Sequence, residues 1–157
     1  MEKKQFIDEV RHTAEGYFER GEFFCSEAVV KTINDMLDKP YDENVTKLAS
    51  GFPVGIGKSK CTCGAVNGAV LCLGYFFGRT KGSNPQDPKS VKALELAYEL
   101  QDSFRQKHKC LCCSVHTKGM DMASGEHKAQ CIKFTGEMAE KAAEIIVREL
   151  NIENIDE

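Results

Sequence analysis

The sequence predicts an all-α fold. Apolar residues recur three and four positions apart along most of the 157-residue chain, which is the spacing of one face of a helix. The alternating pattern that is typical of β-strands is nearly missing. This length suits one ordinary domain with a sizeable core. We therefore expect a compact single-domain bundle of about five to six helices that takes in residues 1–157.

The first three predicted helices each end at a glycine or a proline, the residues that most often stop a helix. They are expected at about residues 3–20, 25–38 and 42–50. Their stop signals are Gly21, Pro40 and Gly51. The third helix is short, and Asp42 is placed to cap its N-terminus.

A glycine-rich loop is expected between Gly51 and Gly57, where three glycines and a proline interrupt regular structure. A fourth helix follows at about residues 63–77 and is unusually rich in small side chains. Its Gly64 and Gly68 would let another backbone or a bulky cofactor approach closely. We therefore expect these two glycines to border a bound group.

Two long helices are predicted in the second half. Asp87 and Pro88 read as the N-cap and first residue of a helix that runs to about residue 107. The inward face of that helix is expected to comprise Val91, Leu94, Ala97, Tyr98 and Phe104. Residues 110–115 form a short turn or helical piece, and the last helix is expected at about 127–150.

Charge and hydropathy exclude several classes of function. The net charge is -3, and no block of basic residues is present to neutralise phosphates, so nucleic acid is not an expected partner. The first ten residues lack the apolar segment of a secretory signal, and a cytoplasmic location is expected. The longest apolar run, residues 69–77, is shorter than the roughly 20 residues that span a bilayer. We therefore expect no membrane insertion.

The segment Gly57-Lys58-Ser59 matches the end of a phosphate-binding loop. That motif needs a glycine five positions before Gly57, and Phe52 stands there. It also needs a preceding β-strand, whereas residues 42–50 read as helix. A glycine turn is the better interpretation.

Cysteine is the most unusual feature of the composition. The eight cysteines are at positions 25, 61, 63, 72, 110, 112, 113 and 131. A reducing cytoplasm does not maintain a disulfide framework, so metal binding or thiol redox chemistry is favoured. The spacing contains one C-x-x-C pair, Cys110 and Cys113, without the second such pair of a typical zinc ribbon.

Two of the cysteines lie near predicted helix starts. At Cys25 and Cys63 the helix dipole and free N–H groups favour the thiolate, which predicts a lowered thiol pKa. A thiolate can act as a metal ligand or as a redox nucleophile. His127 lies four residues before Cys131 on the same helix face and could join a metal site, although surface placement is the commoner role of such a histidine.

Several motifs resemble a specific family. Phe-Cys-Ser-Glu-Ala-Val around Cys25, the segment Cys63-Gly-Ala-Val-Asn-Gly68 and the later cysteines are similar to the redox-active family named for its C-GCAxxG-C-C pattern. The resemblance covers about residues 20–148. It implies a compact helical protein with a four-cysteine site formed by Cys25, Cys63, Cys113 and Cys131.

The chain departs from the family pattern at two places. Ser114 stands where the family often has a basic residue, and Pro53-Val54 replaces glycines that are often found in the loop. Neither departure removes a thiol. Because Cys112 lies beside Cys113 and Cys110 is close in sequence, the choice of the third site cysteine stays open, as do the roles of Cys61 and Cys72.

The leading functional hypothesis is electron transfer by an iron–sulfur cluster or a single metal ion held by the four cysteines, with Gly64 and Gly68 leaving room for it. The expected cofactor is accordingly an iron–sulfur cluster or one ion of iron or zinc. One alternative is thiol–disulfide exchange, with Cys110/Cys113 or Cys112/Cys113 as the reacting pair. Another is a structural zinc or metal-binding module without catalysis. The expected partners are a redox partner protein and, through the small-residue face of the fourth helix, a second copy of the chain in a homodimer.

Overall fold

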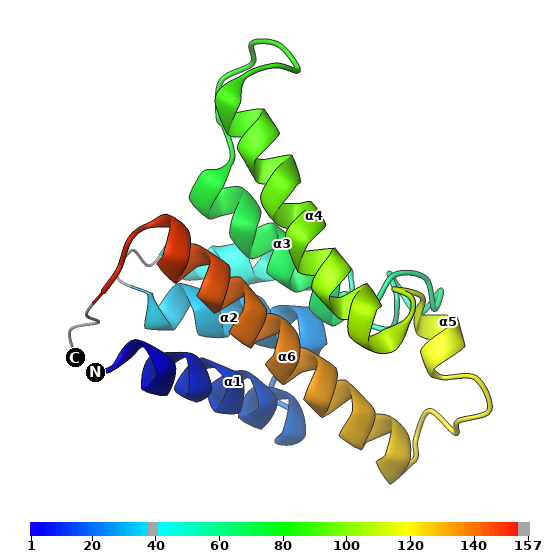
Figure 1. Cartoon of the computed structure of the whole chain (residues 1–157). Coiled ribbons are helices and arrows are strands. Elements are labelled where there is room, and N and C mark those ends of the chain that lie inside the picture. Colours follow the sequence, from blue (N-terminus) through cyan, green and yellow to red (C-terminus); the bar gives the residue numbers. More distant parts are fainter. Residues whose placement is uncertain (38–40, 154–157) are drawn as a thin grey trace.

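The computed structural model describes residues 1–37 and 41–153. These residues form seven helices and no strand (Figure 1). The all-α class is therefore confirmed, whereas the expected number of five to six helices is too low. The difference arises because the piece around residues 110–115 contains a separate helical turn at Cys113–His116.

Apart from the helical turn at Cys113–His116, which starts three residues later than the predicted piece at 110–115, the helices have the predicted bounds to within two residues. They are α1 Lys3–Glu19, α2 Cys25–Met36, the 3₁₀ helix η1 Glu43–Ala49, α3 Gly64–Phe77, α4 Pro88–His108, α5 Cys113–His116 and α6 Gly125–Glu149. The predicted stop at Pro40 lies outside the described residues.

Side-chain caps fix the start of three helices. The Asp42 carboxylate accepts a hydrogen bond from the Asn44 N–H at 2.8 Å, as expected for η1. The Asp87 carboxylate accepts one from Lys89 N–H at 2.9 Å, and Pro88 begins α4. At α6, the Ser124 hydroxyl accepts from the His127 N–H at 3.2 Å. Each cap satisfies a donor that the helix itself leaves free.

The core lies around α6, which runs alongside α1 and passes over α2 in the view of Figure 1. One face of α6 packs on α1, and other parts of it contact α2 and α3. The largest fully buried side chains of this core include Val10, Ile33, Leu73, Phe104 and Ile145. None of the described helices has both the length and the apolar content of a membrane span.

The predicted inward face of α4 is wrong over its first half. Leu94 and Tyr98 are 69% and 61% exposed. The buried residues are Leu96 and Leu100, which were not predicted, and Phe104, which was. These three residues are spaced by four and form a narrow strip. Since α4 packs mainly on α3 and only weakly on α6, a narrow strip is all that its neighbours cover.

Helices α2 and α3 approach closely at Gly68. A Cβ atom at Gly68 would lie 2.6 Å from the carbonyl oxygen of Ser26 in α2, which is closer than side-chain carbon atoms can come. The space that Gly68 leaves is therefore filled by the backbone of α2. This contact places the N-terminus of α2, with Cys25, beside the N-terminus of α3.

The glycine-rich loop before α3 is confirmed, and it has a left-handed backbone. Four of its non-glycine residues have positive φ angles, namely Val54 (55°), Ile56 (69°), Lys58 (66°) and Lys60 (58°). Backbone hydrogen bonds close the loop, including one from the Cys61 N–H to the Gly55 carbonyl at 2.8 Å. The element before the loop is η1, and a phosphate-binding loop would need a strand there.

Candidate four-cysteine site

The four cysteines that the family pattern indicates come from four different helices. Cys25 is the first residue of α2, Cys63 is the N-cap of α3, Cys113 begins α5 and Cys131 lies in the second turn of α6. Three of the four therefore stand at helix starts.

The fold brings these four thiols close enough to influence one another. Ionisation of Cys63, Cys131 or Cys113 would raise the pKa of Cys25 by like-charge repulsion. Cys113 has the same effect on both Cys63 and Cys131. Gly64 allows part of this approach, because a Cβ atom there would lie 2.6 Å from the sulfur of Cys25.

A short backbone clip holds the Cys63 and Cys113 segments together. The N–H of Cys63 donates to the carbonyl of Leu111 at 2.8 Å, and the N–H of Cys113 donates to the carbonyl of Cys61 at 2.6 Å. Thr62 and Cys112 face each other between these two bonds as an isolated antiparallel bridge. The clip holds the Cys113 segment beside Cys63. Of Cys110, Cys112 and Cys113, it is Cys113 whose charge adds to the effect of burial in raising the thiol pKa of Cys25, Cys63 and Cys131. Its role as the third site cysteine stays a prediction.

At the two helix starts with Cys25 and Cys63, the thiol pKa is shifted in the direction opposite to the expected one. Burial, as the main cause, raises the pKa of Cys63 to about 11 and also raises that of Cys25. The backbone N–H groups of Val66 and Ala65 offset only part of the effect at Cys63. Desolvation of the charged form therefore outweighs the helix dipole here. The prediction of lowered pKa values at Cys25 and Cys63 was wrong, although their placement at helix starts is confirmed.

The other two site thiols behave in the same way. Burial followed by repulsion from Cys63 and Cys113 raises the pKa of Cys131 to about 12. The pKa of Cys113 is also raised, mainly by burial, while the Thr117 hydroxyl and the positive charge of Lys60 act against this. At neutral pH these four cysteines are therefore protonated thiols unless a cation is bound.

Cys112 differs from its neighbours. A hydrogen bond between its sulfur and the Ser114 hydroxyl, at 2.9 Å, is the main cause of a lowered thiol pKa, and the N–H groups of Val115 and Ser114 add to it. The sequence did not lead us to predict a lowered pKa for Cys112. The serine two positions after it is the one signal in the sequence.

The remaining cysteines lie apart from the four-thiol group. Cys72 is fully buried, accepts a hydrogen bond from the Tyr75 hydroxyl at 3.4 Å and packs in the core. Burial raises its pKa to about 12. Cys61 is exposed, and the sulfur of Cys110 lies 3.7 Å from Nε2 of His116.

One histidine contacts the site. Nε2 of His127 lies 3.4 Å from the sulfur of Cys131, as their spacing of one helical turn predicts. In the part of the chain that the structure describes, no three Cys, His, Asp or Glu side chains already surround a common point as metal ligands. The close approach expected at Gly68 is made by the backbone of α2, which fills the space beside this glycine. Contact of Gly64 or Gly68 with a cofactor stays a prediction.

These features define a helical protein with a partly buried group of four thiols that come from separate helices. The family model described as "Putative redox-active protein (C_GCAxxG_C_C)" matches residues 23–145. The chain belongs to this family. Searches of curated proteins and of solved structures found no match.

Proposed function

We propose that Cys25, Cys63, Cys113 and Cys131 hold an iron–sulfur cluster or a single metal ion, and that the protein transfers electrons through it. The observation that carries the proposal is the mutual influence of four partly buried thiols on separate helices. Four thiolates in this position would repel one another, and a bound cation converts that repulsion into attraction. A four-cysteine set is the usual ligand set of [2Fe–2S] and [4Fe–4S] clusters and of many zinc sites.

The surrounding residues suit this role. Burial of the thiols limits access by water, which affects both the stability and the potential of such a group. The N–H groups of Ala65 and Val66 act on the Cys63 sulfur, and that of Ser26 acts on Cys25. Both effects favour the ionised form that a metal requires. Because the thiols are protonated in its absence, binding must release protons.

Anaerobic purification with metal analysis tests the proposal. We expect a brown protein with bound iron and acid-labile sulfide if a cluster is held, or stoichiometric iron without acid-labile sulfide if a single redox-active ion is held. Serine substitution of each of the four cysteines should remove the metal. The matched control is Cys61→Ser, because this exposed thiol lies in the same loop as Cys63. A metal-free anaerobic preparation would overturn the proposal, and colourless zinc protein that unfolds with a chelator would favour a structural site.

A second candidate, thiol–disulfide exchange, is supported by the lowered pKa of Cys112. In this scheme the Cys112 thiolate attacks a disulfide in a substrate protein and displaces one of its sulfurs as a thiolate. Cys113 or Cys110 then attacks the mixed disulfide, which releases the reduced substrate and leaves a disulfide in this chain. Mass mapping of the oxidised protein should find a reversible linkage between Cys112 and one of these two thiols. If no such linkage forms, this candidate is excluded.

We also propose that the protein binds two kinds of partner, a redox partner protein and a second copy of the chain. The exposed apolar side chains of Val91, Leu94 and Tyr98 on α4 support a protein contact on that helix. Measurement of the molar mass in solution distinguishes a monomer from a homodimer.

A further inference from the structure

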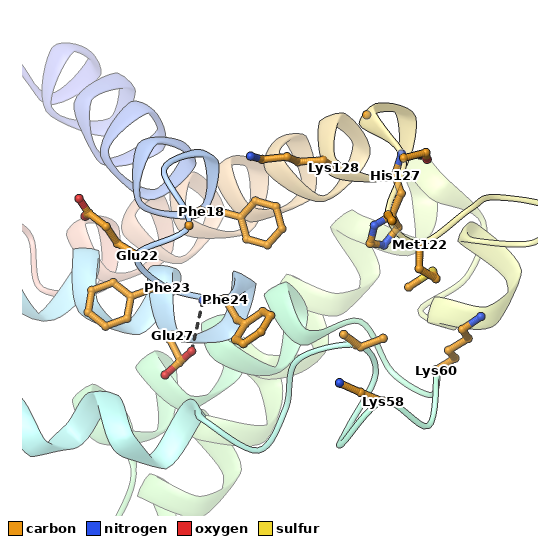
Figure 2. A pocket seen from close by; sticks show the side chains of 15 residues that line it. Phe18, Glu22, Phe23, Phe24, Glu27, Lys58, Lys60, Met122, His127 and Lys128 are labelled. Atoms are coloured by element: carbon orange, nitrogen blue, oxygen red, sulfur yellow. Dashed lines mark hydrogen bonds between the residues drawn. The ribbon is translucent and has the colours of Figure 1, made fainter.

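A cavity lies close to the four-cysteine site, and none of the four site cysteines lines it. It has a volume of about 760 Å³, which is within the range of small-molecule sites in proteins. Its apolar walls come from the end of α1, the turn before α2, the loop before α3 and the segment before α6 (Figure 2). Its apolar lining residues include Phe18, Phe23, Phe24, Val54 and Met122. We call it the aromatic cavity after the three phenylalanines.

The aromatic side chains provide a flat apolar surface. The rings of Phe18 and Phe24 lie in the space between α1, α2 and the loop before α3 (Figure 2). Phe24 is 55% exposed, which is unusual for a phenylalanine in a folded chain. Such rings contact other flat ring systems by offset or edge-to-face stacking.

Positive charge at the cavity is available for a ligand. Lys58, Lys60 and Lys128 line it, and Figure 2 shows Lys58 and Lys128 on opposite sides. In residues 1–37 and 41–153, none of the three ammonium groups takes part in a hydrogen bond or ion pair (Figure 2).

The carboxylates at the cavity offset only part of this positive charge. The Glu22 carboxylate accepts hydrogen bonds from Arg20 at 3.1 and 3.2 Å, and Arg20 balances its charge. The Glu27 carboxylate accepts from two neutral donors, the Phe24 N–H at 3.2 Å and the Ser50 hydroxyl at 3.0 Å, and so keeps its charge. Three lysines against this one carboxylate leave the cavity lining positive, and an anionic group complements it.

The cavity adjoins three of the four site cysteines. Phe24 directly precedes Cys25, and His127 contacts the sulfur of Cys131 at 3.4 Å. The charge of Lys60 acts on the thiol of Cys113. An occupant of the cavity is thus placed next to the thiol group.

We propose that the aromatic cavity binds a small molecule that combines a flat apolar ring system with an anionic group. The rings stack on the phenylalanine side chains, and the anion pairs with Lys58 and Lys128. This inference rests on the cavity and its charges, so it holds whether or not the thiols carry a metal.

Titration with 2-naphthoate tests the inference, with 2-naphthylmethanol and 2-naphthylmethylamine as neutral and cationic probes of the same ring. We expect one saturable site for naphthoate, at least fivefold weaker binding of the alcohol and weaker binding still of the amine. Amide NMR shifts on titration should gather at the cavity walls. No saturable binding up to millimolar naphthoate, equal affinity for the three probes, or shifts elsewhere in the chain would overturn the inference.

A matched pair of double substitutions tests the charge contribution. Lys58→Gln with Lys128→Gln should weaken naphthoate binding at least fivefold, because both exposed lysines line the cavity. Lys81→Gln with Lys118→Gln removes the same net charge from exposed positions outside the cavity and should change the affinity less than twofold. Equal effects of the two pairs would show attraction by net charge alone and overturn the inference. Lys60 is left intact because it acts on Cys113.

Discussion

At the scale of single residues, burial decides how each cysteine ionises. Cys63 lies at a helix start, yet its thiol pKa is raised to about 11, whereas the partly exposed Cys112 has a lowered pKa. The free energy lost when a thiolate is removed from water is larger than the stabilisation that the helix N-terminus provides. Two measurable consequences follow, one for stability and one for reactivity.

The reduced, metal-free protein should lose stability as the pH rises above about 8.5, the ordinary thiol pKa. In the unfolded chain the thiols release their protons near that pH, but in the folded chain Cys63 and Cys131 retain theirs until about pH 11 and 12. Below about pH 8.5 the contribution of these raised pKa values to the free energy of unfolding is fully present. Between about pH 8.5 and the pKa of each thiol in the folded chain this contribution falls, at no more than about 1.4 kcal/mol per pH unit for each thiol. Urea unfolding between about pH 8 and pH 10 measures this.

The matched variants for this experiment are Cys131→Ala and Cys61→Ala. The first should make the pH dependence shallower, since it removes a thiol with a raised pKa. The second should leave the slope unchanged, since Cys61 is exposed. Parallel curves for all three proteins would contradict the assignment of the slope to buried thiols.

Cys112 should be alkylated by iodoacetamide several times faster than Cys113 at neutral pH. Its lowered pKa gives it a larger thiolate fraction, and thiolate is the reactive form. Peptide mass spectrometry after brief labelling ranks the two sites. Ser114→Ala removes the hydroxyl that lies 2.9 Å from the Cys112 sulfur and should slow the reaction of Cys112. If Cys113 reacts first, the contrast between the two thiols is wrong.

At the scale of helices, glycines in α3 have opposite roles. Gly68 faces the backbone of Ser26, whereas a Cβ atom at Gly74 would meet nothing within 4 Å. Gly68→Ala should therefore destabilise the protein by about 1–3 kcal/mol, because two helix backbones must separate. Gly74→Ala should stabilise it by up to about 1 kcal/mol through helix propensity. Urea unfolding of the two variants measures the difference, and equal effects would contradict close packing at Gly68.

The helices themselves could be predicted from local patterns, since periodicity and caps such as Asp87 act over a few residues. The buried face of α4 could not, because apolar residues lie on two sides and only the position of α3 selects Leu96 and Leu100. The left-handed backbone at Val54 and Ile56 could not be predicted either, since β-branched residues disfavour positive φ.

Prediction of the site has a similar limit. Family motifs indicated the four cysteines, and the structure shows that their thiols act on one another. The raised pKa of Cys63 depends on burial by distant segments, so the sequence near it predicted the wrong sign. The aromatic cavity joins four segments far apart in the chain, and no local pattern marks it.

At the scale of the whole molecule, the proposed metal would join four helices and should stabilise the entire fold. A ligand at 100 times its dissociation constant adds about 2.7 kcal/mol to the unfolding free energy. We expect zinc added to the reduced protein to raise its Tm and a chelator to reverse this. Cys131→Ser should abolish the shift and Cys61→Ser should retain it. The shift should shrink at acidic pH, where protons compete for the thiols. An unchanged Tm would speak against metal binding.

The placement of the fourth cysteine also sets an order in time. Cys131 belongs to α6, the last helix of the chain, and ribosomes make the N-terminal segments first. A growing chain that has reached α5 carries Cys25, Cys63 and Cys113 but still lacks Cys131. The complete thiol set therefore exists only once the second turn of α6 has been made. Loading of the proposed four-ligand metal would begin no earlier than that, so it could not guide the folding of α1 to α5 during their synthesis.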